Sequence, residues 1–127
     1  MPAGRPSEGI GDLQTFKATF FKALAHPVRI RILEELVHGE RSVQEIQSAL
    51  RLEQPVVSQQ LGVLRANNVV VGRKTGVSVR YSVRDQLVGD LLDVARQIFD
   101  NQLSGTRTLL RQLQKERRQR QSRRERL

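Results

Sequence analysis

Cysteine is absent from this sequence, and its absence narrows the chemistry open to the chain. Without a thiol, the chain can form no disulfide, no thiolate nucleophile and no cysteine-based metal site. No stretch approaches the roughly 18 apolar residues that a membrane-spanning helix needs. Residues 1–11 lack the basic segment and apolar run of a signal peptide. We therefore expect a cytoplasmic protein that makes no contact with a membrane.

Patterns typical of an enzyme are also missing. The sequence contains no nucleophile–base pair, no glycine-rich phosphate loop and no cluster of Asp, Glu and His. The two histidines, His26 and His38, each fall at one end of an expected helix, where capping is the simplest role. The carboxylates of the expected last helix would form a poor site for zinc or softer metals. We predict no catalytic residue, no cofactor and no metal site.

Positive charge is plentiful, but it is concentrated at one end of the chain. The net charge is +9, from 22 Lys and Arg against 13 Asp and Glu. Nine of the basic residues and only two of the acidic ones lie in residues 107–127, so the remaining chain is close to neutral. A basic balance favours a polyanionic partner. Nucleic-acid binding by the body of the chain must therefore be argued from its motifs.

Helical periodicity dominates residues 12–66. Asp12 is an expected cap for a first helix, and Pro27 suits the first position of a second helix, which Gly39 ends. Ser42 and Glu45 have the spacing of a capping box, which predicts a short third helix. After a tight connection over 51–54, a fourth helix begins at Pro55. The expected apolar seams comprise Leu13, Phe16, Phe20 and Leu24, then Val28, Ile32, Leu33, Leu36 and Val37, then Val43, Ile46, Ala49 and Leu50, and finally Val57, Leu61 and Leu64.

The periodicity then changes to that of β-strands. Residues 69–74 and 77–83 are rich in β-branched side chains and flank Thr75-Gly76, which predicts a β-hairpin. Its second strand alternates, with Val77, Val79, Tyr81 and Val83 on the expected buried face. Asp85 is an expected cap for a long last helix, and Gly105 an expected point where the chain loosens. We predict a disordered lead-in at 1–11, one domain at 12–105 and a basic extension at 106–127.

This order of elements predicts a mainly α-helical fold with a small β-hairpin: a winged helix-turn-helix. In such a unit the second helix of the pair packs one side against the body and offers the other to the major groove of DNA. Gln can bond bidentately to adenine, and small residues allow close approach. The candidate DNA-reading residues of the fourth helix are Gln54, Pro55, Ser58, Gln59, Gln60, Gly62 and Val63. The alternative is that the glutamines are simply solvated.

The expected wing carries basic side chains near its tip. Arg73, Lys74 and Arg80 could contact the phosphates that flank a major groove. Basic residues on exposed strands also protect a sheet edge from aggregation. Both interpretations of these residues stay open at this point.

Three stretches together resemble the ArsR-type family of winged-helix regulators. They are Phe21–Leu36, Gln54–Arg65 and Val71–Gly76, within a likeness that covers roughly residues 13–103. The resemblance implies a homodimer that pairs through its first and last helices, occupies a palindromic operator and usually represses. It also implies that Gln54, Ser58, Gln59 and Gln60 lie where the family reads DNA, with Arg73, Lys74 and Arg80 in the wing. Many family members sense metals, but the Cys of their third helix and the His of their last helix have no counterpart here.

The first and last expected helices carry more apolar residues than one small core needs. A dimer seam is one use for the surplus, and burial within one subunit is the alternative. The candidate interface residues are Leu13, Phe16, Phe20, Leu91, Leu92, Ala95, Ile98 and Phe99. An unknown effector stays open: a small molecule at the seam, a protein partner or no ligand at all. A protein-interaction module and a sequence-indifferent nucleic-acid-binding protein are the rival functions.

Overall fold

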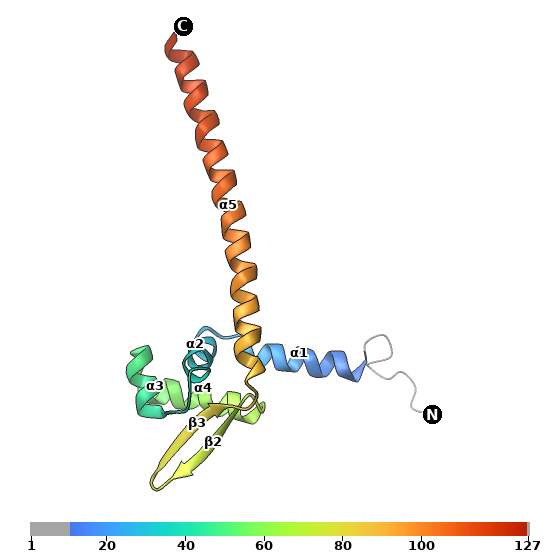
Figure 1. Ribbon diagram of the computed structural model, residues 1–127, viewed down its shortest axis with the longest axis vertical. Coiled ribbons are helices and arrows are strands. Elements are labelled where there is room, and N and C mark those ends of the chain that lie inside the picture. The colour runs from blue at the N-terminus through green and yellow to red at the C-terminus, as the bar shows by residue number, and fades with distance from the viewer. Residues whose placement is uncertain (1–10, 127) are drawn as a thin grey trace. The chain divides into compact units, whose positions relative to one another are not determined.

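The computed structural model describes residues 11–126, so the expected disordered lead-in lies almost entirely outside the described residues (Figure 1). Contacts divide the chain after Gly89 into two compact units. The elements, in order, are α1 (Asp12–Leu24), α2 (Pro27–Leu36), β1 (Arg41–Ser42), α3 (Val43–Leu50), α4 (Gln54–Ala66), β2 (Val70–Thr75), β3 (Ser78–Val83) and α5 (Leu87–Arg126). The prediction of a mainly helical winged helix-turn-helix is confirmed.

Local signals in the sequence set most helix ends. Pro27 occupies the first turn of α2, and the His26 Nδ1 atom accepts a hydrogen bond from the Val28 amide at 3.1 Å. The capping box of α3 forms as expected, with the side chains of Ser42 and Glu45 each accepting from the other's backbone amide. The prediction that Asp12 caps α1 is wrong, because α1 already includes Asp12 and its N-cap is Gly11.

The core of the first unit lies between α2, α3, α4 and the base of the hairpin. Each of these elements buries one aliphatic side against the others, which removes a continuous apolar surface from water. Only the last residues of α1, Ala23 and Leu24, join this core. Its most completely buried side chains are Ile32, Leu33, Leu36, Ile46, Val57, Leu61, Leu64, Val69 and Val70. Helix α4 is therefore held on its inner side by the rest of the unit.

The β-structure is a sheet of three strands rather than a hairpin alone. Its order is β1-β3-β2, and both pairings are antiparallel. The short strand β1 is an addition to the predicted hairpin. The turn also differs from the prediction, because Thr75 pairs with Ser78 and the two turn residues are Gly76 and Val77. Gly76 has a positive φ of 63°, as the first position of a type II′ turn requires. Val77 is fully exposed, so its expected place on the buried face is wrong.

Helix α5 runs without interruption from Leu87 to Arg126 (Figure 1). The Asp85 carboxylate accepts a hydrogen bond from the Leu87 amide at 2.9 Å, as expected of a cap. Gly105 lies within the helix and not at a break, so the predicted loosening there is wrong. Among residues 11–126, no helix is long and apolar enough to cross a membrane.

Candidate nucleic-acid interface

The helix-turn-helix consists of α3, a short turn and α4. Arg51 ends α3 in the left-handed conformation, with φ 56°, and its amide bonds back to the Gln47 carbonyl. This sharp reversal lets α4 begin at Gln54, one residue before the predicted start. Val57, Leu61 and Leu64 are almost completely buried, at 0%, 1% and 0% exposure. Because these residues recur on one side of α4, the opposite side faces solvent.

The solvent side of α4 holds the candidate DNA-reading residues. Gln54, Pro55, Gln59 and Gly62 are exposed, while Ser58, Gln60 and Val63 are half-buried. The Gln54 amide donates to the Ser58 hydroxyl at 3.3 Å, which links the first two turns of this face. No acidic residue lies within α4. The structure thus brings the seven residues together on one helix and leaves most of them accessible.

Gly62 has no packing reason to be glycine within the described chain. A Cβ atom built at this position meets no atom within 4 Å. Glycine in a helix interior costs about 1 kcal/mol relative to alanine. Close packing against a neighbouring helix of the same chain can require such a glycine. The open space around Gly62 excludes this explanation. Close approach of another molecule at Gly62 stays a prediction.

The basic residues of the wing lie on adjacent strands, and two of them are held by carboxylates. Arg73 on β2 forms an ion pair with Glu40 at 2.7 Å. Arg80 on β3 approaches Glu40 at 3.6 Å and Glu45 at 3.0 Å. Lys74 lies beside Arg73 and is exposed. The two carboxylates therefore offset much of the wing's positive charge.

These ion pairs shift the titration of the groups that form them. The hydrogen bond from Arg73 lowers the pKa of Glu40, and the nearby positive charges of Arg73 and Arg80 add to the effect. The Ser42 amide, which donates to the carboxylate, is the main cause of the lowered pKa of Glu45, with Arg80 contributing. In turn Glu40 raises the pKa of Arg73. All three groups are solvent-accessible, so salt screens their interactions.

Sequence reasoning misses Glu40 and the second role of Glu45. The capping box explains Glu45 from the sequence, yet its Oε1 atom accepts from both the Ser42 amide and the Arg80 guanidinium. The partners of the three ion pairs are 33, 35 and 40 residues apart along the chain. The pairing of Ser42 with Arg80 brings them together, so only a prediction of β1 would have revealed the contact.

The candidate dimer residues of α1 include side chains in its first turns that are exposed to solvent. Leu13 and Phe16 are 59% and 74% exposed, and Phe20 is half-buried. Phe20 meets Phe21 edge to face, with ring centroids 5.7 Å apart. Apolar side chains that lie exposed together on one side of a helix often mark an interaction surface. The alternative that α1 simply buries its apolar side within one subunit fails for Leu13 and Phe16.

Helix α5 likewise exposes an apolar side. Ile98 and Phe99 are 50% and 58% exposed, while Leu91, Leu92 and Ala95 are half-buried. Exposed apolar residues continue beyond the predicted interface, and they too recur at helical spacing. They are Leu103, Leu109, Leu110 and Leu113.

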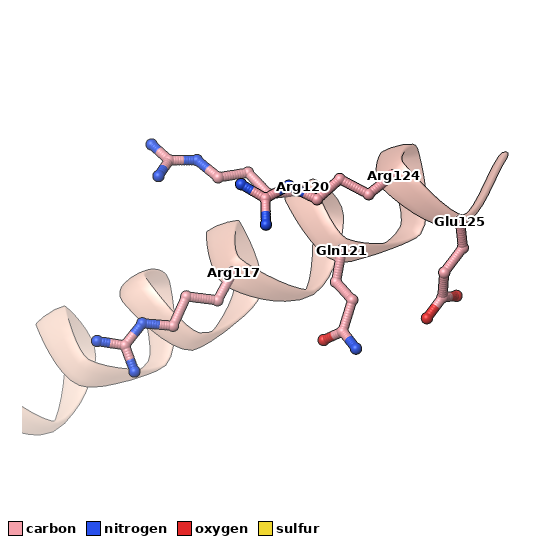
Figure 2. Close-up of a pocket in the computed structure, with 5 residues that line it drawn as sticks. All are labelled: Arg117, Arg120, Gln121, Arg124 and Glu125. Carbon is pink, nitrogen blue, oxygen red and sulfur yellow. The ribbon is translucent and has the colours of Figure 1, made fainter. Parts of the chain in front are cut away.

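The final turns of α5 have no apolar residues and many cations. Figure 2 shows Arg117, Arg120 and Arg124 extending from this helix, with Gln121 and Glu125 beside them. The same segment also carries the exposed cations Lys115, Arg118, Arg123 and Arg126, with Gln119 and Ser122 between them. In residues 11–126, the ion pairs join Arg73 and Arg80 to Glu40 and Glu45, and none involves this segment.

Comparisons with known proteins agree on the class of this fold. Residues 24–73 match the family described as "Helix-turn-helix domain". The uncharacterized HTH-type transcriptional regulator Rv0081 of Mycobacterium tuberculosis is 47% identical over 102 residues, which span 80% of this chain and 90% of the relative. The biofilm growth-associated repressor of Xylella fastidiosa is 36% identical over 67% of this chain and 75% of its own length.

Solved structures give the same result. The crystal structure of Rv0081 superposes with a TM-score of 0.67 at 48% identity, covering 74% of this chain and 95% of that one. The homodimeric winged helix-turn-helix DNA-binding domain of Mb0332 from Mycobacterium bovis has a TM-score of 0.67 at 27% identity, covering 81% of this chain and 94% of that one. With the helix-turn-helix and wing in place, these likenesses identify the chain as a member of the ArsR-type family of winged helix-turn-helix transcriptional regulators.

Proposed function

We propose that this regulator is a sequence-specific repressor that binds a palindromic operator as a homodimer, with α4 as its reading helix. One observation carries the proposal: α4 buries an aliphatic seam completely and presents to solvent an exposed, glutamine-rich side without acidic residues. A major groove admits one α-helix, and it is read by donors and acceptors rather than by negative charge. The relatives named as regulators and repressors support this function.

The contacts expected of α4 follow from its exposed residues. Gln59 is exposed near the middle of the helix, where its amide could bond bidentately to an adenine edge. Gln54 and Ser58, already linked to each other, suit a phosphate or a base at the leading end. Pro55, Gln60 and Val63 would border these contacts. Gly62 would let the helix backbone come close to the DNA.

The wing would position the domain rather than read sequence. Arg73, Lys74 and Arg80 suit phosphate oxygens next to the groove, and phosphate contacts carry no base information. Because Glu40 and Glu45 hold two of these three cations, the wing should contribute less to affinity than its basic residues suggest. Arg73→Ala should therefore weaken binding to all sequences to a similar degree.

A second copy of the chain accounts for the exposed apolar sides of α1 and α5. In this proposal, both helices supply the dimer interface. The residues are Leu13, Phe16 and Phe20 on α1, and Leu91, Leu92, Ala95, Ile98 and Phe99 on α5. A two-fold symmetric pair would present two copies of α4, which must lie about 34–36 Å apart to read adjacent major grooves. The Mb0332 domain is described as homodimeric, which supports this assembly. The proposal assigns no catalytic residue and places the protein with DNA in the cytoplasm.

The test is selection of a binding site from a randomised duplex library, followed by affinity measurements. Gln59→Ala should cost about 1–3 kcal/mol on the selected duplex and relax the preference at one base position of each half-site. Gln86→Ala, at an exposed glutamine outside α4, is the matched control and should bind like the parent.

Two outcomes would contradict the proposal in different ways. If the parent fails to prefer the selected duplex over random DNA by roughly a thousandfold, the protein is a sequence-indifferent nucleic-acid binder. If it binds neither duplex, the protein-interaction module becomes the better interpretation.

A further inference from the structure

The largest concentration of cations in this protein lies outside the helix-turn-helix. From Arg107 onward α5 carries nine Lys and Arg residues and only Glu116 and Glu125 as counter-charges. All side chains of the helix from Asn101 to Arg126 are exposed. The wing, in contrast, has two of its three basic side chains held by carboxylates. Most of the net positive charge of the chain is therefore on this part of α5.

The cations at the end of α5 are arranged along the helix and not at random. Arg117, Arg120 and Arg124 are spaced i, i+3 and i+7, so they share one side of the helix, and Figure 2 shows all three extended. At a rise of about 1.5 Å per residue, they span about 10 Å along the axis. Phosphates on one DNA strand follow one another about every 3.4 Å of the duplex axis, so three such guanidiniums can each meet a different phosphate group.

This arrangement is unfavourable for an isolated helix. Like charges at i, i+3 and i, i+4 repel each other and destabilise a helix. Arg120 and Arg124 form such a pair, as do Arg107 and Arg111, and Arg111 and Lys115. A helix that is polar all round also lacks packing to hold it. A bound polyanion would remove the repulsion, so this segment is chemically suited to a phosphate-rich partner.

The composition of the segment favours DNA over a membrane surface. A helix that lies in a bilayer interface needs an apolar face of residues such as Leu, Phe or Trp. Lys115–Arg126 contains no apolar residue, and seven of its side chains are basic, one lysine and six arginines. Arg is the preferred partner of phosphate because its planar fork donates two parallel hydrogen bonds.

We propose that Lys115–Arg126 is a second DNA-binding element, which contacts the phosphate backbone without reading sequence. The inference rests on the proposed DNA binding by α4 and adds a separate, sequence-independent contribution to the affinity. The side that carries Arg117, Arg120 and Arg124 makes the contact. The two elements have separate roles in DNA binding: α4 selects the site, and the end of α5 strengthens binding to any duplex.

The experiment compares the full-length parent with two triple variants at Arg117, Arg120 and Arg124. One replaces all three by Gln, and the matched control replaces all three by Lys, which keeps the charge. Gln and Lys have helix propensities close to that of Arg, so both variants should fold. Affinity is measured over a range of salt concentrations, on the duplex selected from the library and on a random duplex of equal length.

The Gln variant should lose about 0.9 units of the slope of log K against log salt for each phosphate contact removed, roughly three units per subunit. Its affinity at moderate salt should fall roughly tenfold to a hundredfold on both duplexes, so the preference for the selected duplex is retained. The Lys variant should keep the parent's slope. Circular dichroism should show the same helix content in the parent and in both variants, so that a changed slope reports lost contacts and not a lost helix.

An unchanged slope in the Gln variant on both duplexes would overturn the inference, and it would leave α4 as the reading helix. Binding of the parent to vesicles of acidic phospholipid that is lost in the Gln variant, with the DNA slope unchanged, would also overturn it in favour of a membrane surface. Loss of the parent's preference for the selected duplex is a different result. It would contradict the proposed function, while the salt slopes would still decide whether this segment contacts phosphate.

Discussion

Helices α4 and α5 are both apolar on one side, yet the chain covers only one of these sides. The seam of α4 is almost completely buried by the rest of its unit, whereas Ile98, Phe99 and Leu103 of α5 are at least half exposed. The difference shows what each helix offers to another molecule. With its apolar side covered, α4 presents polar groups, and α5 presents the apolar side itself.

Removing packing beneath α4 should have the largest effect on the stability of the subunit. Leu61 is 1% exposed, so Leu61→Ala should create a cavity and lower the free energy of unfolding by about 2–5 kcal/mol. Denaturant unfolding measures the loss. Leu103→Ala is the matched control on α5, and it should change the stability of the subunit by much less because that side chain is exposed. Equal losses would contradict the contrast between the two helices.

The exposed apolar side of α5 should be covered by a second copy of the chain, and a charge placed there should weaken the dimer. Phe99→Glu places a charge in the proposed dimer seam and should weaken dimerisation by about 2–4 kcal/mol, since truncation of a central aromatic residue has this effect on interfaces. Sedimentation equilibrium over a range of concentrations gives the dissociation constant. Val77→Glu, at an exposed valine in the wing turn, should leave the dimer intact. A parent protein that is monomeric at all concentrations would show that α5 has no second copy as its partner.

Local chemistry is enough to predict most of the fold. The capping box at Ser42, the proline at the start of α2 and the seam of α4 depend on residues within a few positions of one another. Such patterns determine a helix end or a buried side without knowledge of the rest of the chain. The place of α4 and its exposed glutamines follow from these signals alone.

The features that sequence reasoning misses depend on distant contacts. Strand β1 has only two residues, Arg41 and Ser42, too few to show alternation, and it exists because β3 pairs with it. The ion pairs of the wing depend on the same pairing. The predicted break at Gly105 fails for another reason. One glycine destabilises a helix by about 1 kcal/mol, which is too little to interrupt a long helix. Val77 does not lie on the buried face of the hairpin because the turn begins one residue later than predicted.

The third prediction separates stability from recognition at one residue of α4. Gly62→Ala should raise the free energy of unfolding by about 0.5–1 kcal/mol, because alanine is the better helix former and the added Cβ meets open space. The same change should weaken binding to the selected duplex if the backbone approaches DNA at Gly62. Gly105→Ala is the matched control, since its Cβ would also meet nothing within 4 Å. It should stabilise the helix without changing operator affinity, and equal DNA binding by both variants would remove Gly62 from the interface.

The smallest effect concerns the ion pairs of the wing. Glu40→Gln removes the carboxylate that holds Arg73, so the Arg73 guanidinium becomes available to phosphate, whereas Arg80 stays paired with Glu45 at 3.0 Å. Affinity for random duplex should rise modestly, and the slope of log K against log salt should steepen by about one unit for each cation released. Glu34→Gln, at an exposed glutamate of α2, is the control for the change in net charge.

The pH dependence of stability gives an independent check on the same contact. Because folding lowers the pKa of Glu40, the ion pair stabilises the native state above the unfolded-state pKa of the carboxyl, near 4.5. This contribution is lost as the pH falls through the lower, folded-state pKa. The parent should therefore be slightly more stable than Glu40→Gln at neutral pH, and the two should converge in acid. A difference that persists at a pH where Glu40 is protonated would mean that the amide itself disturbs packing, and the rise in DNA affinity could not then be assigned to released charge.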